Sequence, residues 1–493
     1  MRNEVDNYIE NVIKVGDEGS KLLAAVCAPT LKNNEFVRIL KQGMNGIATL
    51  KVPNDYYVAV HSASGHDEKG REIGISHYTH NMVKTLVEQS KLIGATPIAF
   101  ANVIDSATGD IKLLTTIANV LVTEANMHHL AILNGENAIL GNRVTKEANV
   151  SGTMISFVPK KSIETIGVLK RKDINFIIFN PYEKPVYMNS DGIGTKTEFY
   201  ERKGNHFELA LADSLAMKVD DSIKLGAVVK AVSDVVEIGS HAMKSELIKK
   251  HILTVFKKQA EELGRLMHAA YILQFEDATG RIGGYEGNNF VFNISGSAVS
   301  TIDEERLANP LKPKAGDYIV AIRGKPTPRS NGITAKRETM VKVFGNEWHK
   351  TDIGKIFMEY LAEPSTIFYP VFRELVDNNL ASSVYHMSGG AYNGKLARPI
   401  AQHGLFAHME NLFEPDWREV TLAAYSLSAK EAYAKFPMGN EGFITTDYPS
   451  KAIQVINKFG LEARVVAELK KTDRTGVEFK AFNGQDIYFS GKD

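Results

Sequence analysis

Val87-Glu-Gln-Ser-Lys-Leu-Ile-Gly-Ala and Val219-Asp-Asp-Ser-Ile-Lys-Leu-Gly-Ala are two stretches of this 493-residue chain that resemble each other. In both stretches, the Gly-Ala pair is typical of the end of a helix that precedes an apolar strand. Upstream of them, Tyr57-Val-Ala-Val-His-Ser resembles Val186-Tyr-Met-Asn-Ser as a short strand ending in polar residues. Similar segments in the same order indicate an internal repeat.

Two further pairs extend the repeat. Asn134-Gly-Glu-Asn-Ala matches Gln274-Phe-Glu-Asp-Ala, and Val150-Ser-Gly-Thr-Met-Ile-Ser-Phe matches Ile294-Ser-Gly-Ser-Ala-Val-Ser-Thr. We therefore interpret residues 51–165 and 166–310 as two copies of one α/β domain, which can pack as an internal pseudo-dimer. Similar α/β patterns without common ancestry are the alternative.

The rest of the chain predicts an N-terminal extension over residues 1–50 and a C-terminal α/β domain over residues 311–493. Asn309-Pro-Leu-Lys-Pro-Lys-Ala-Gly-Asp has the composition of a linker. After it, β-like runs alternate with helical patterns such as Ser450-Lys-Ala-Ile-Gln-Val-Ile-Asn-Lys-Phe-Gly. The expected fold class is α/β, or α+β.

The composition is that of a globular chain. It has 58 Lys and Arg against 58 Asp and Glu, so it carries no electrostatic signature of a nucleic-acid-binding protein. Cys27 is the single cysteine, which excludes an internal disulfide. The acidic start lacks an export signal, and each apolar run is soon broken by charge. We expect a cytoplasmic protein that does not enter membranes.

Asp191-Gly-Ile-Gly-Thr-Lys directly follows a predicted strand. Gly192 and Gly194 permit a tight turn that exposes backbone N–H groups, while Asp191 and Lys196 supply opposite charges. This combination suits a metal-bound polyphosphate. A plain capped turn is the alternative, because the stretch is neither a Walker A loop nor a dinucleotide-binding fingerprint.

Acidic residues follow in a helical pattern. Asp213-Ser-Leu-Ala-Met-Lys-Val-Asp-Asp places Asp213 and Asp220 on one helix face. With Asp191 and Glu276-Asp277, these acids could hold Mg²⁺ bound to ATP, since Mg²⁺ prefers a few carboxylates together with phosphate oxygens. The alternative for any one of them is a solvated helix face or a helix cap.

The first copy lacks these acids. It has Ala63 at the position of Asp191, and Glu88-Gln89 at the position of Asp220-Asp221, although it keeps Gly135-Glu136-Asn137. We predict one competent nucleotide site, in the second copy.

Two segments of the C-terminal domain have the pattern of anion-binding turns. Ser330-Asn-Gly opens a predicted helix, and Ser388-Gly-Gly lies between a strand and a helix. Ordinary helix capping explains either one alone. His386, which precedes the second segment, is a weaker candidate for an acid or a base.

In these motifs the sequence resembles the phosphoribosylformylglycinamidine cyclo-ligases, also called aminoimidazole ribonucleotide synthases, and the wider superfamily of ATP-binding proteins built like them. Asp191-Gly-Ile-Gly-Thr-Lys resembles the family's D-G-x-G-T-K element, and residues 213–221 resemble its D-x-x-A-M-x-x-N-D helix. The other matches, in the family's order, are Glu276-Asp-Ala, Ser330-Asn-Gly, His386-Met-Ser-Gly-Gly and Phe436-Pro-Met-Gly-Asn.

The resemblance implies an ATP-binding core and a C-terminal domain that closes over a small-molecule nucleotide substrate. It implies the ATP-dependent cyclisation of formylglycinamidine ribonucleotide to aminoimidazole ribonucleotide in purine biosynthesis, through phosphorylation of the formamide oxygen. ATP and Mg²⁺ are the implied cofactors. The implied catalytic residues are Asp191, Lys196 and Asp221. The implied nucleotide-binding residues are Asp191, Gly192, Gly194, Thr195, Lys196, Glu276 and Asp277, and the implied metal ligands are Asp191, Asp220, Asp221 and Glu276. The implied substrate-binding residues are Ser330, Asn331, Gly332, Ser388, Gly389 and Gly390.

Three departures from the family pattern stand out. Asp220 replaces the helix asparagine, Gln274-Phe275 replaces the paired glycines before Glu276, and Arg329 stands where the family often has histidine. The alternatives for function are another ATP-dependent ligase or kinase of the superfamily that acts on a different amide or amine, and a nucleotide-binding protein without catalysis. With an internal pseudo-dimer, we expect a monomer, or a homodimer formed through another surface.

Overall fold

The computed structural model describes residues 18–40, 47–65, 74–164, 166–204, 206–239, 246–278, 280–284 and 290–491. These residues form two compact units. The two-sheet unit lies within residues 8–218 and 227–305, and the described residues of the C-terminal unit are 219–226 and 306–491. Within the described ranges, none of the helices has the length and apolar character required to cross a membrane.

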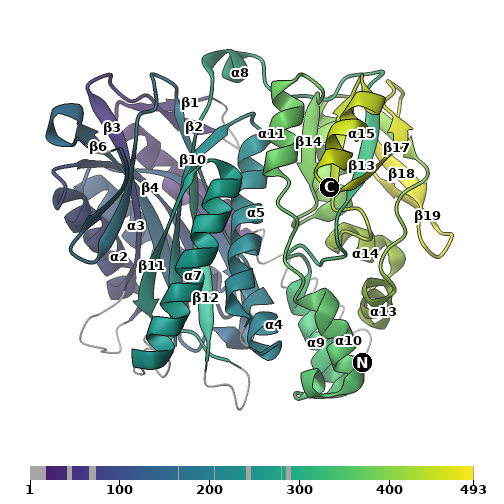
Figure 1. The fold of residues 1–493 in the computed structure, drawn as a ribbon, viewed down its shortest axis with the longest axis horizontal. Helices are drawn as coiled ribbons and strands as arrows, with labels where there is room; N and C mark the ends of the chain where they lie inside the picture. Colours follow the sequence, from purple (N-terminus) through teal and green to yellow (C-terminus); the bar gives the residue numbers. More distant parts are fainter. Residues whose placement is uncertain are drawn as a thin grey trace. The chain divides into compact units, whose positions relative to one another are not determined.

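The two-sheet unit contains two sheets of six strands each among its described residues (Figure 1). The first sheet has the order β5-β4-β6-β3-β8-β7, and the second has the order β11-β10-β12-β9-β2-β1. The strands of the first sheet are β3 (Tyr56–Ser64), β4 (Thr96–Ser106), β5 (Ala131–Ile139), β6 (Ala148–Pro159), β7 (Gly167–Arg171) and β8 (Ile174–Phe179). Those of the second are β1 (Val37–Ile39), β2 (Ala48–Leu50), β9 (Val186–Gly192), β10 (Val228–Ile238), β11 (Ala270–Asp277) and β12 (Phe292–Thr301).

The two sheets share one topology. In each, one parallel pair, β4 with β5 or β10 with β11, is followed by antiparallel pairing throughout. The short hairpins are exchanged between the two halves of the unit. β1 and β2 precede the first sheet in sequence but pair with β9, whereas β7 and β8 follow the strands of the first sheet and pair with β3. The predicted boundary at residue 50 separates the β1–β2 hairpin from β3, and the boundary at residue 165 separates β6 from the β7–β8 hairpin.

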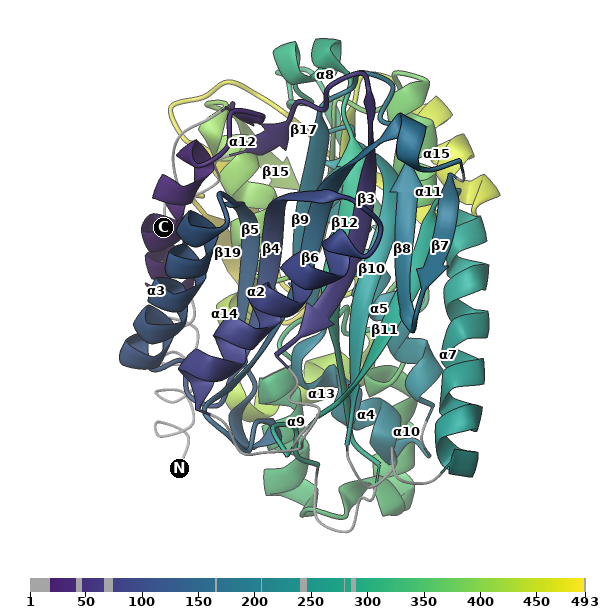
Figure 2. The same cartoon turned by 90° about the vertical axis from the view of Figure 1, so that its left-hand side faces the viewer.

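The core of this unit lies between the sheets, and helices cover their outer faces. Val60 and Phe157 of the first sheet pack in one buried cluster with Met188 and Val299 of the second. Helix α2 lies across β6 and beside α3, and α7 runs along β11 (Figure 2). The helices of the unit are α2 (Ile75–Lys91), α3 (Ile111–Met127), α4 (Thr197–Arg202), α5 (Ala210–Ile223), α7 (Glu246–Met267) and α8 (Glu304–Ala308); α5 and α8 each end in the C-terminal unit.

A line of buried polar side chains also joins the two sheets. Ser151 of β6 and Ser295 of β12 share a hydrogen bond of 2.6 Å, and Ser62 of β3 donates to Ser233 of β10 at 2.7 Å. These hydroxyls are buried, and each finds a partner in the opposite sheet. The seam between the sheets is therefore hydrogen-bonded as well as packed, which fixes how the sheets face each other.

Reciprocal contacts continue the seam. Asp105 pairs with Asn149 in the register of the first sheet, as Glu237 pairs with Asn293 in that of the second. Across the seam, Asn293 donates to the Asp105 carboxylate at 2.7 Å and Asn149 donates to Glu237. Each asparagine thus donates to the carboxyl group that pairs, in the opposite sheet, with the other asparagine. Reciprocal contacts of this kind are typical of an interface with two-fold symmetry.

The strand register agrees with part of the sequence match. Ala63 pairs with Gly152, as Asp191 pairs with Gly296, so Ala63 occupies in the first sheet the place that Asp191 occupies in the second. The sequence match of Glu136 to Glu276 is wrong, because the two residues do not occupy equivalent positions in the strand pairing of the two sheets.

Glu276 pairs with Glu237, but Asp105, the counterpart of Glu237, pairs with Ala138. The counterpart of Glu276 in the first sheet is therefore Ala138, two residues after Glu136, and the pairing of β4 with β5 is irregular whereas that of β10 with β11 is regular.

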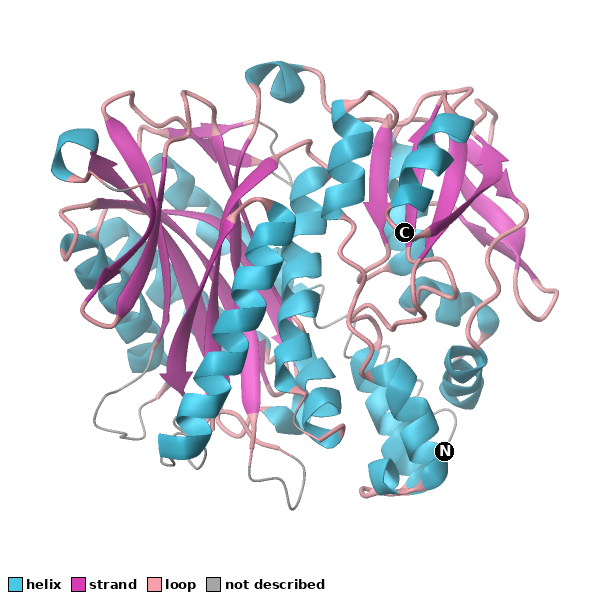
Figure 3. Ribbon diagram, in the orientation of Figure 1, coloured by secondary structure: helices cyan, strands magenta, loops and turns pink. Residues whose placement is uncertain are grey.

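The C-terminal unit has a four-stranded sheet of order β14-β16-β13-β17 and a three-stranded sheet of order β15-β18-β19 among its described residues. Figure 3 shows these strands in magenta among cyan helices. The strands are β13 (Tyr318–Arg323), β14 (Ser383–His386), β15 (Phe406–Met409), β16 (Gly442–Thr446), β17 (Glu462–Glu468), β18 (Gly476–Lys480) and β19 (Asp486–Phe489). The helices are α9 (Ile333–Phe344), α10 (Asp352–Leu361), α11 (Tyr369–Asp377), η7 (Tyr392–Ala397), α12 (Arg398–Gln402), α13 (Trp417–Ser426), α14 (Ala429–Lys435) and α15 (Pro449–Lys458).

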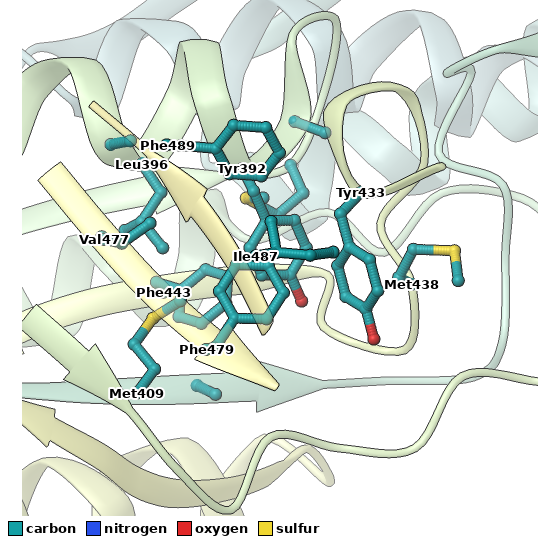
Figure 4. Packing of buried hydrophobic residues seen from close by; sticks show 14 of the residues in the cluster. Tyr392, Leu396, Met409, Tyr433, Met438, Phe443, Val477, Phe479, Ile487 and Phe489 are labelled. Atoms are coloured by element: carbon teal, nitrogen blue, oxygen red, sulfur yellow. The ribbon is translucent and has the colours of Figure 1, made fainter. Parts of the chain in front are cut away.

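Aromatic side chains fill the core of this unit (Figure 4). The Tyr392 ring lies 5.0 Å from those of Tyr433 and Phe479, measured between centroids, and 5.7 Å from that of Phe443. Large aromatic surfaces removed from water contribute strongly to core stability. Because Tyr392 directly follows Ser388-Gly-Gly-Ala, this cluster anchors one of the predicted anion-binding segments.

We predict that Gly296→Ala destabilises the protein more than Gly152→Ala does. A Cβ on Gly296 would collide with the backbone of Ser233 and Asp234, which the sheet holds in place. A Cβ on Gly152 would meet the ends of two flexible side chains, 2.6 Å from Met82 Sδ and 3.0 Å from Leu86 Cδ1. Urea unfolding should show a loss of about 1–3 kcal/mol for Gly296→Ala. Equal losses in the two variants would contradict this view of the paired glycines.

Candidate functional site

The loop after β9 carries the first group of predicted residues. Gly194 has φ +56°, a left-handed conformation that favours glycine. Asp191 turns back on its own loop, where its Oδ1 accepts from the Gly192 N–H at 2.7 Å. Thr195 and Lys196 follow in a short turn and are buried. The sequence expectation of a tight, glycine-dependent turn at this point is confirmed.

Lys196 lies in a buried ion pair. Its Nζ donates to Asp213 Oδ1 at 2.8 Å, and Tyr200 donates its hydroxyl to the other oxygen of the same carboxylate. Both charged side chains of this pair are fully buried. Lys196 was predicted to lie near phosphates, and the structure shows it bound to an acid of α5 that the sequence assigned to a helix face.

A second buried pair, which the sequence analysis missed, lies one turn further along α5. Lys218 donates to Asp234 of β10, and Tyr271 of β11 donates its hydroxyl to the same carboxylate at 2.5 Å. Burial lowers the pKa of Lys218, while Asp234 and then Asp191 oppose that shift. Lys218 interrupts the apolar face of the helix, and this break in the sequence pattern could have indicated a buried ion pair.

Three carboxyl groups gather where β4, β10 and β11 end. Burial raises the pKa of Glu276 to about 8, with Glu237 beside it adding to the shift. Burial also raises the pKa of Glu237 to about 7 and that of Asp105 to about 6. Phe275 does not crowd this group, because its ring packs 6.0 Å from that of Phe256 on α7 and strand alternation points Glu276 to the other face.

The end of α5 carries a second charged cluster, within the C-terminal unit. Asp221 Oδ1 accepts from His386 Nε2 at 2.9 Å and from Lys224, and Lys395 lies 3.8 Å away. Burial alone would raise the pKa of Asp221, but Lys224, Lys395 and His386 hold it well below its usual value. Asp221 is therefore ionised and surrounded by donors. Burial lowers the pKa of His386 well below its usual value, and Lys224 adds to that shift, so the imidazole is neutral.

Asp220 has a different environment although it is adjacent. Its Oδ1 accepts from the Tyr369 backbone N–H at 2.7 Å, and its Oδ2 accepts from Arg329 Nη2 at 3.1 Å. Both side chains of this ion pair are fully buried. Burial raises the pKa of Asp220 to about 6, against the opposing effect of Arg329. Both carboxylate oxygens of Asp220 therefore accept hydrogen bonds from residues of the C-terminal unit.

The two predicted anion-binding segments lie side by side. Asn331 Nδ2 donates to the Ser388 backbone carbonyl at 2.9 Å, so the Ser330-Asn-Gly turn contacts the Ser388-Gly-Gly segment directly. Gly332 has φ +61°, and a Cβ there would strike the ring of Phe436. Gly389 and Gly390 are exposed. Ser330 Oγ is buried and has no hydrogen-bond partner among the described residues, which leaves it available to a ligand.

The predicted magnesium ligands fall into two groups. Asp191 and Glu276 belong to the two-sheet unit, whereas Asp220 and Asp221 belong to the C-terminal unit. Within the described part of the chain, no group of three or more His, Cys, Asp or Glu residues could hold a metal ion. Asp220 accepts from Arg329 and from the Tyr369 backbone, and the role of these four residues as magnesium ligands stays a prediction.

The structure therefore brings together, in the C-terminal unit, the residues predicted from the end of α5 and from the two turns. Those from the loop after β9, with Glu276 and Asp277, lie in the two-sheet unit. Sequence reasoning missed Lys224 and Lys395 beside Asp221. Lys224 could have been found, because residues three apart on a helix are neighbours.

We predict that Asp105→Asn removes part of the pH dependence of stability. The folded chain keeps a proton on Asp105 up to about pH 6, whereas the unfolded chain has released it by about pH 4. The free energy of unfolding therefore falls as pH rises through this window. Asparagine keeps an acceptor for Asn293 and carries no charge, so the variant should gain on the order of 2 kcal/mol at pH 8 and little at pH 4.

Urea unfolding at the two pH values measures this difference. Asp303→Asn, which removes an exposed carboxylate, is the matched control and should show no such pH dependence. An Asp105→Asn variant whose stability relative to wild type is the same at both pH values would contradict the assignment.

Comparisons with known proteins bear on the family. No family model matches the chain. The chain is 25% identical over 301 residues to phosphoribosylformylglycinamidine cyclo-ligase from Carboxydothermus hydrogenoformans, covering 59% of this chain and 83% of that relative. It is 23% identical over 320 residues to the protein of the same name from Prochlorococcus marinus, covering 62% of this chain and 86% of that relative. A third relative of that name, from Methanococcus vannielii, is 24% identical over 301 residues, covering 59% of this chain and 79% of its own length.

Solved structures give weaker similarities. Thiamine-monophosphate kinase from Stenotrophomonas maltophilia superposes with a TM-score of 0.42 at 13% identity, covering 65% of this chain and 93% of that chain. Thermotoga maritima PurL complexed with AMPPCP gives a TM-score of 0.36 at 15% identity, covering 62% of this chain and 43% of that chain. The sequence comparisons thus confirm that the chain resembles the phosphoribosylformylglycinamidine cyclo-ligase family, as its motifs indicate.

Proposed function

We propose that the protein is an ATP-dependent enzyme that cyclises formylglycinamidine ribonucleotide to aminoimidazole ribonucleotide in purine biosynthesis. The observation that carries this proposal is the cluster in the C-terminal unit. There, His386 joins the family's H-x-[ST]-G-G segment to Asp221 of the α5 motif, and Asn331 joins it to the S-N-G turn. Three motifs that are distant in sequence thus meet in one place. The names of the relatives support the same activity.

The proposed reaction has two steps. The formamide oxygen first attacks the γ-phosphorus of ATP, which forms an O–P bond and releases ADP. The amidine nitrogen then attacks the activated carbon, the C–O bond to the phosphoryl group breaks, and inorganic phosphate and one proton leave as the imidazole ring forms. Such chemistry depends on positioning and on neutralising the charge of the transferred group.

The chain offers suitable groups for both tasks. The exposed backbone at Gly389 and Gly390 can donate to anionic oxygens, and so can the Ser330 hydroxyl, which lacks a hydrogen-bond partner among the residues that the structure describes. Lys224 and Lys395 place two positive charges beside Asp221, where they can also reach a phosphate group. In the two-sheet unit, the backbone of the turn at Gly192 and Gly194 is our candidate for contact with the ATP phosphates.

We also infer that the two six-stranded sheets are copies of one ancestral domain that form an internal pseudo-dimer. Their common topology, the exchanged hairpins and the reciprocal Asn contacts support this inference. Ala63 stands in the first sheet at the place of Asp191, so we propose one competent nucleotide site for each chain, in the second copy.

The first prediction of this proposal concerns stoichiometry and turnover. Calorimetric titration with Mg·ATP should give one bound nucleotide per chain. On the same sample, ADP release should depend on formylglycinamidine ribonucleotide. Binding without substrate-dependent release would favour another substrate or a non-catalytic role, and two nucleotides turned over per chain would contradict the single-site view.

The second prediction concerns Asp221. Asp221→Asn removes the ionised carboxylate that His386, Lys224 and Lys395 surround, so substrate-dependent ADP release should fall by about 100-fold or more. Asp303→Asn, an exposed carboxylate of the two-sheet unit, makes the same charge change and should retain full activity. Thermal unfolding checks that both variants fold. An active Asp221→Asn enzyme would overturn the role of this residue.

A further inference from the structure

Arg329 is a position at which the chain departs from the family pattern, and its surroundings are unusual for an arginine. The side chain is completely buried in the C-terminal unit. Its backbone has φ +51°, and Ser330 next to it has φ +49°, so two consecutive residues other than glycine hold the left-handed conformation. Such strain persists only where surrounding contacts over-determine the local structure.

The guanidinium supplies those contacts. Nη2 donates to Asp220 at 3.1 Å, and Nη1 donates to the Thr366 backbone carbonyl at 2.7 Å. The same group lies 4.7 Å from the centroid of the Phe368 ring and 3.8 Å from Glu441. Arg329 therefore ties the Ser330-Asn-Gly turn to the end of α5 and to the segment that precedes α11.

A further contact determines the state of His386. Arg329 Nη2 lies 3.2 Å from His386 Nδ1. A guanidinium has donors only, so Nδ1 must be the acceptor and carry no proton. The neutral imidazole then bears its single proton on Nε2, and this N–H points to Asp221 Oδ1 at 2.9 Å. The order of donation is thus Arg329 to His386 to Asp221.

We propose that Arg329 is a positioning residue of the candidate site, which fixes the Nε2–H tautomer and orientation of His386 and thereby the orientation of the Asp221 carboxylate. The proposal rests on the proposed function in so far as Asp221 is a site residue. It also gives Asp220 a role: this acid balances the buried charge of Arg329, and it accepts from the backbone of Tyr369 at the start of α11. The pair Asp220–Arg329 thus acts on the site through His386.

The test is a measurement of the His386 tautomer by NMR of protein labelled with ¹⁵N-histidine. The chain has 14 histidines, and His386→Gln identifies the signals of this one. In the wild type, we expect an unprotonated Nδ1 and a protonated Nε2 on His386. Arg329→Met, which keeps an unbranched apolar stem but has no donor, should give a mixture of tautomers or the Nδ1–H form, whereas Arg329→Lys should restore part of the wild-type signal.

Two further variants keep the test decisive. Arg329→Met leaves Asp220 buried without its cation, so the double variant Arg329→Met/Asp220→Asn removes both charges and should fold if the single variant does not. Arg143→Met removes another buried arginine, paired with Glu201 in the two-sheet unit, and should destabilise the protein without moving the His386 signals. An unchanged tautomer in the folded double variant would overturn the proposal.

Kinetics provide the second measurement. With formylglycinamidine ribonucleotide as substrate, Arg329→Met/Asp220→Asn should lower kcat by about 10- to 100-fold, and Arg329→Lys should recover part of this loss. A loss of kcat without a change of tautomer would show that Arg329 acts on stability alone. If the wild type has no turnover, the proposed function fails, but the tautomer measurement still decides the role of Arg329.

Discussion

The seam between the two six-stranded sheets is the constraint on which the rest of the two-sheet unit depends. The second sheet takes β1 and β2 from residues that precede the first sheet, and the first sheet takes β7 and β8 from residues that directly precede β9, so the first sheet forms between two parts of the second. Buried serine hydroxyls and carboxamides then bond across the seam, for example Ser151 with Ser295. Because an unpaired buried hydroxyl is costly, these bonds permit one registration of the sheets. That registration sets where β9 ends and where the Asp191 loop begins.

Helix α5 has residues in both units. Its first turns are held in the two-sheet unit by two buried ion pairs, Asp213 with Lys196 and Lys218 with Asp234. Its last turn belongs to the C-terminal unit, where Asp220 and Asp221 have partners of their own. A helix with three buried charges, Asp213, Lys218 and Asp220, is costly unless each one is paired, so the pairs make the position of the helix specific.

Environment gives identical side chains different roles. Asp220 and Asp221 are neighbours in sequence, but successive residues point in different directions from a helix. Asp220 meets a single buried guanidinium and a backbone N–H, whereas Asp221 meets a neutral imidazole and two ammonium groups. In the two-sheet unit, burial raises the pKa values of Glu237 and Glu276, and a neighbouring carboxyl group adds to each shift: Asp105 acts on Glu237, and Glu237 acts on Glu276.

The sequence by itself determined the α/β class, the turns at Asp191, Ser330 and Ser388, and the resemblance to the cyclo-ligases, because these depend on local patterns of glycine, apolar residues and acids. The sequence also matched Ala63 to Asp191 in agreement with the strand register. Ala63 of β3 pairs with the glycine of a Ser-Gly pair in β6, and Asp191 of β9 pairs with the glycine of the matching Ser-Gly pair in β12. The match of Glu136 to Glu276 failed because the register in which two strands pair leaves no local signal in the sequence. Tertiary structure alone decided the exchange of the hairpins, the partner of Lys196 and the burial of Arg329 between Asp220 and His386. Each of these joins residues that are distant along the chain, and the partner of a buried charge is chosen by the fold as a whole.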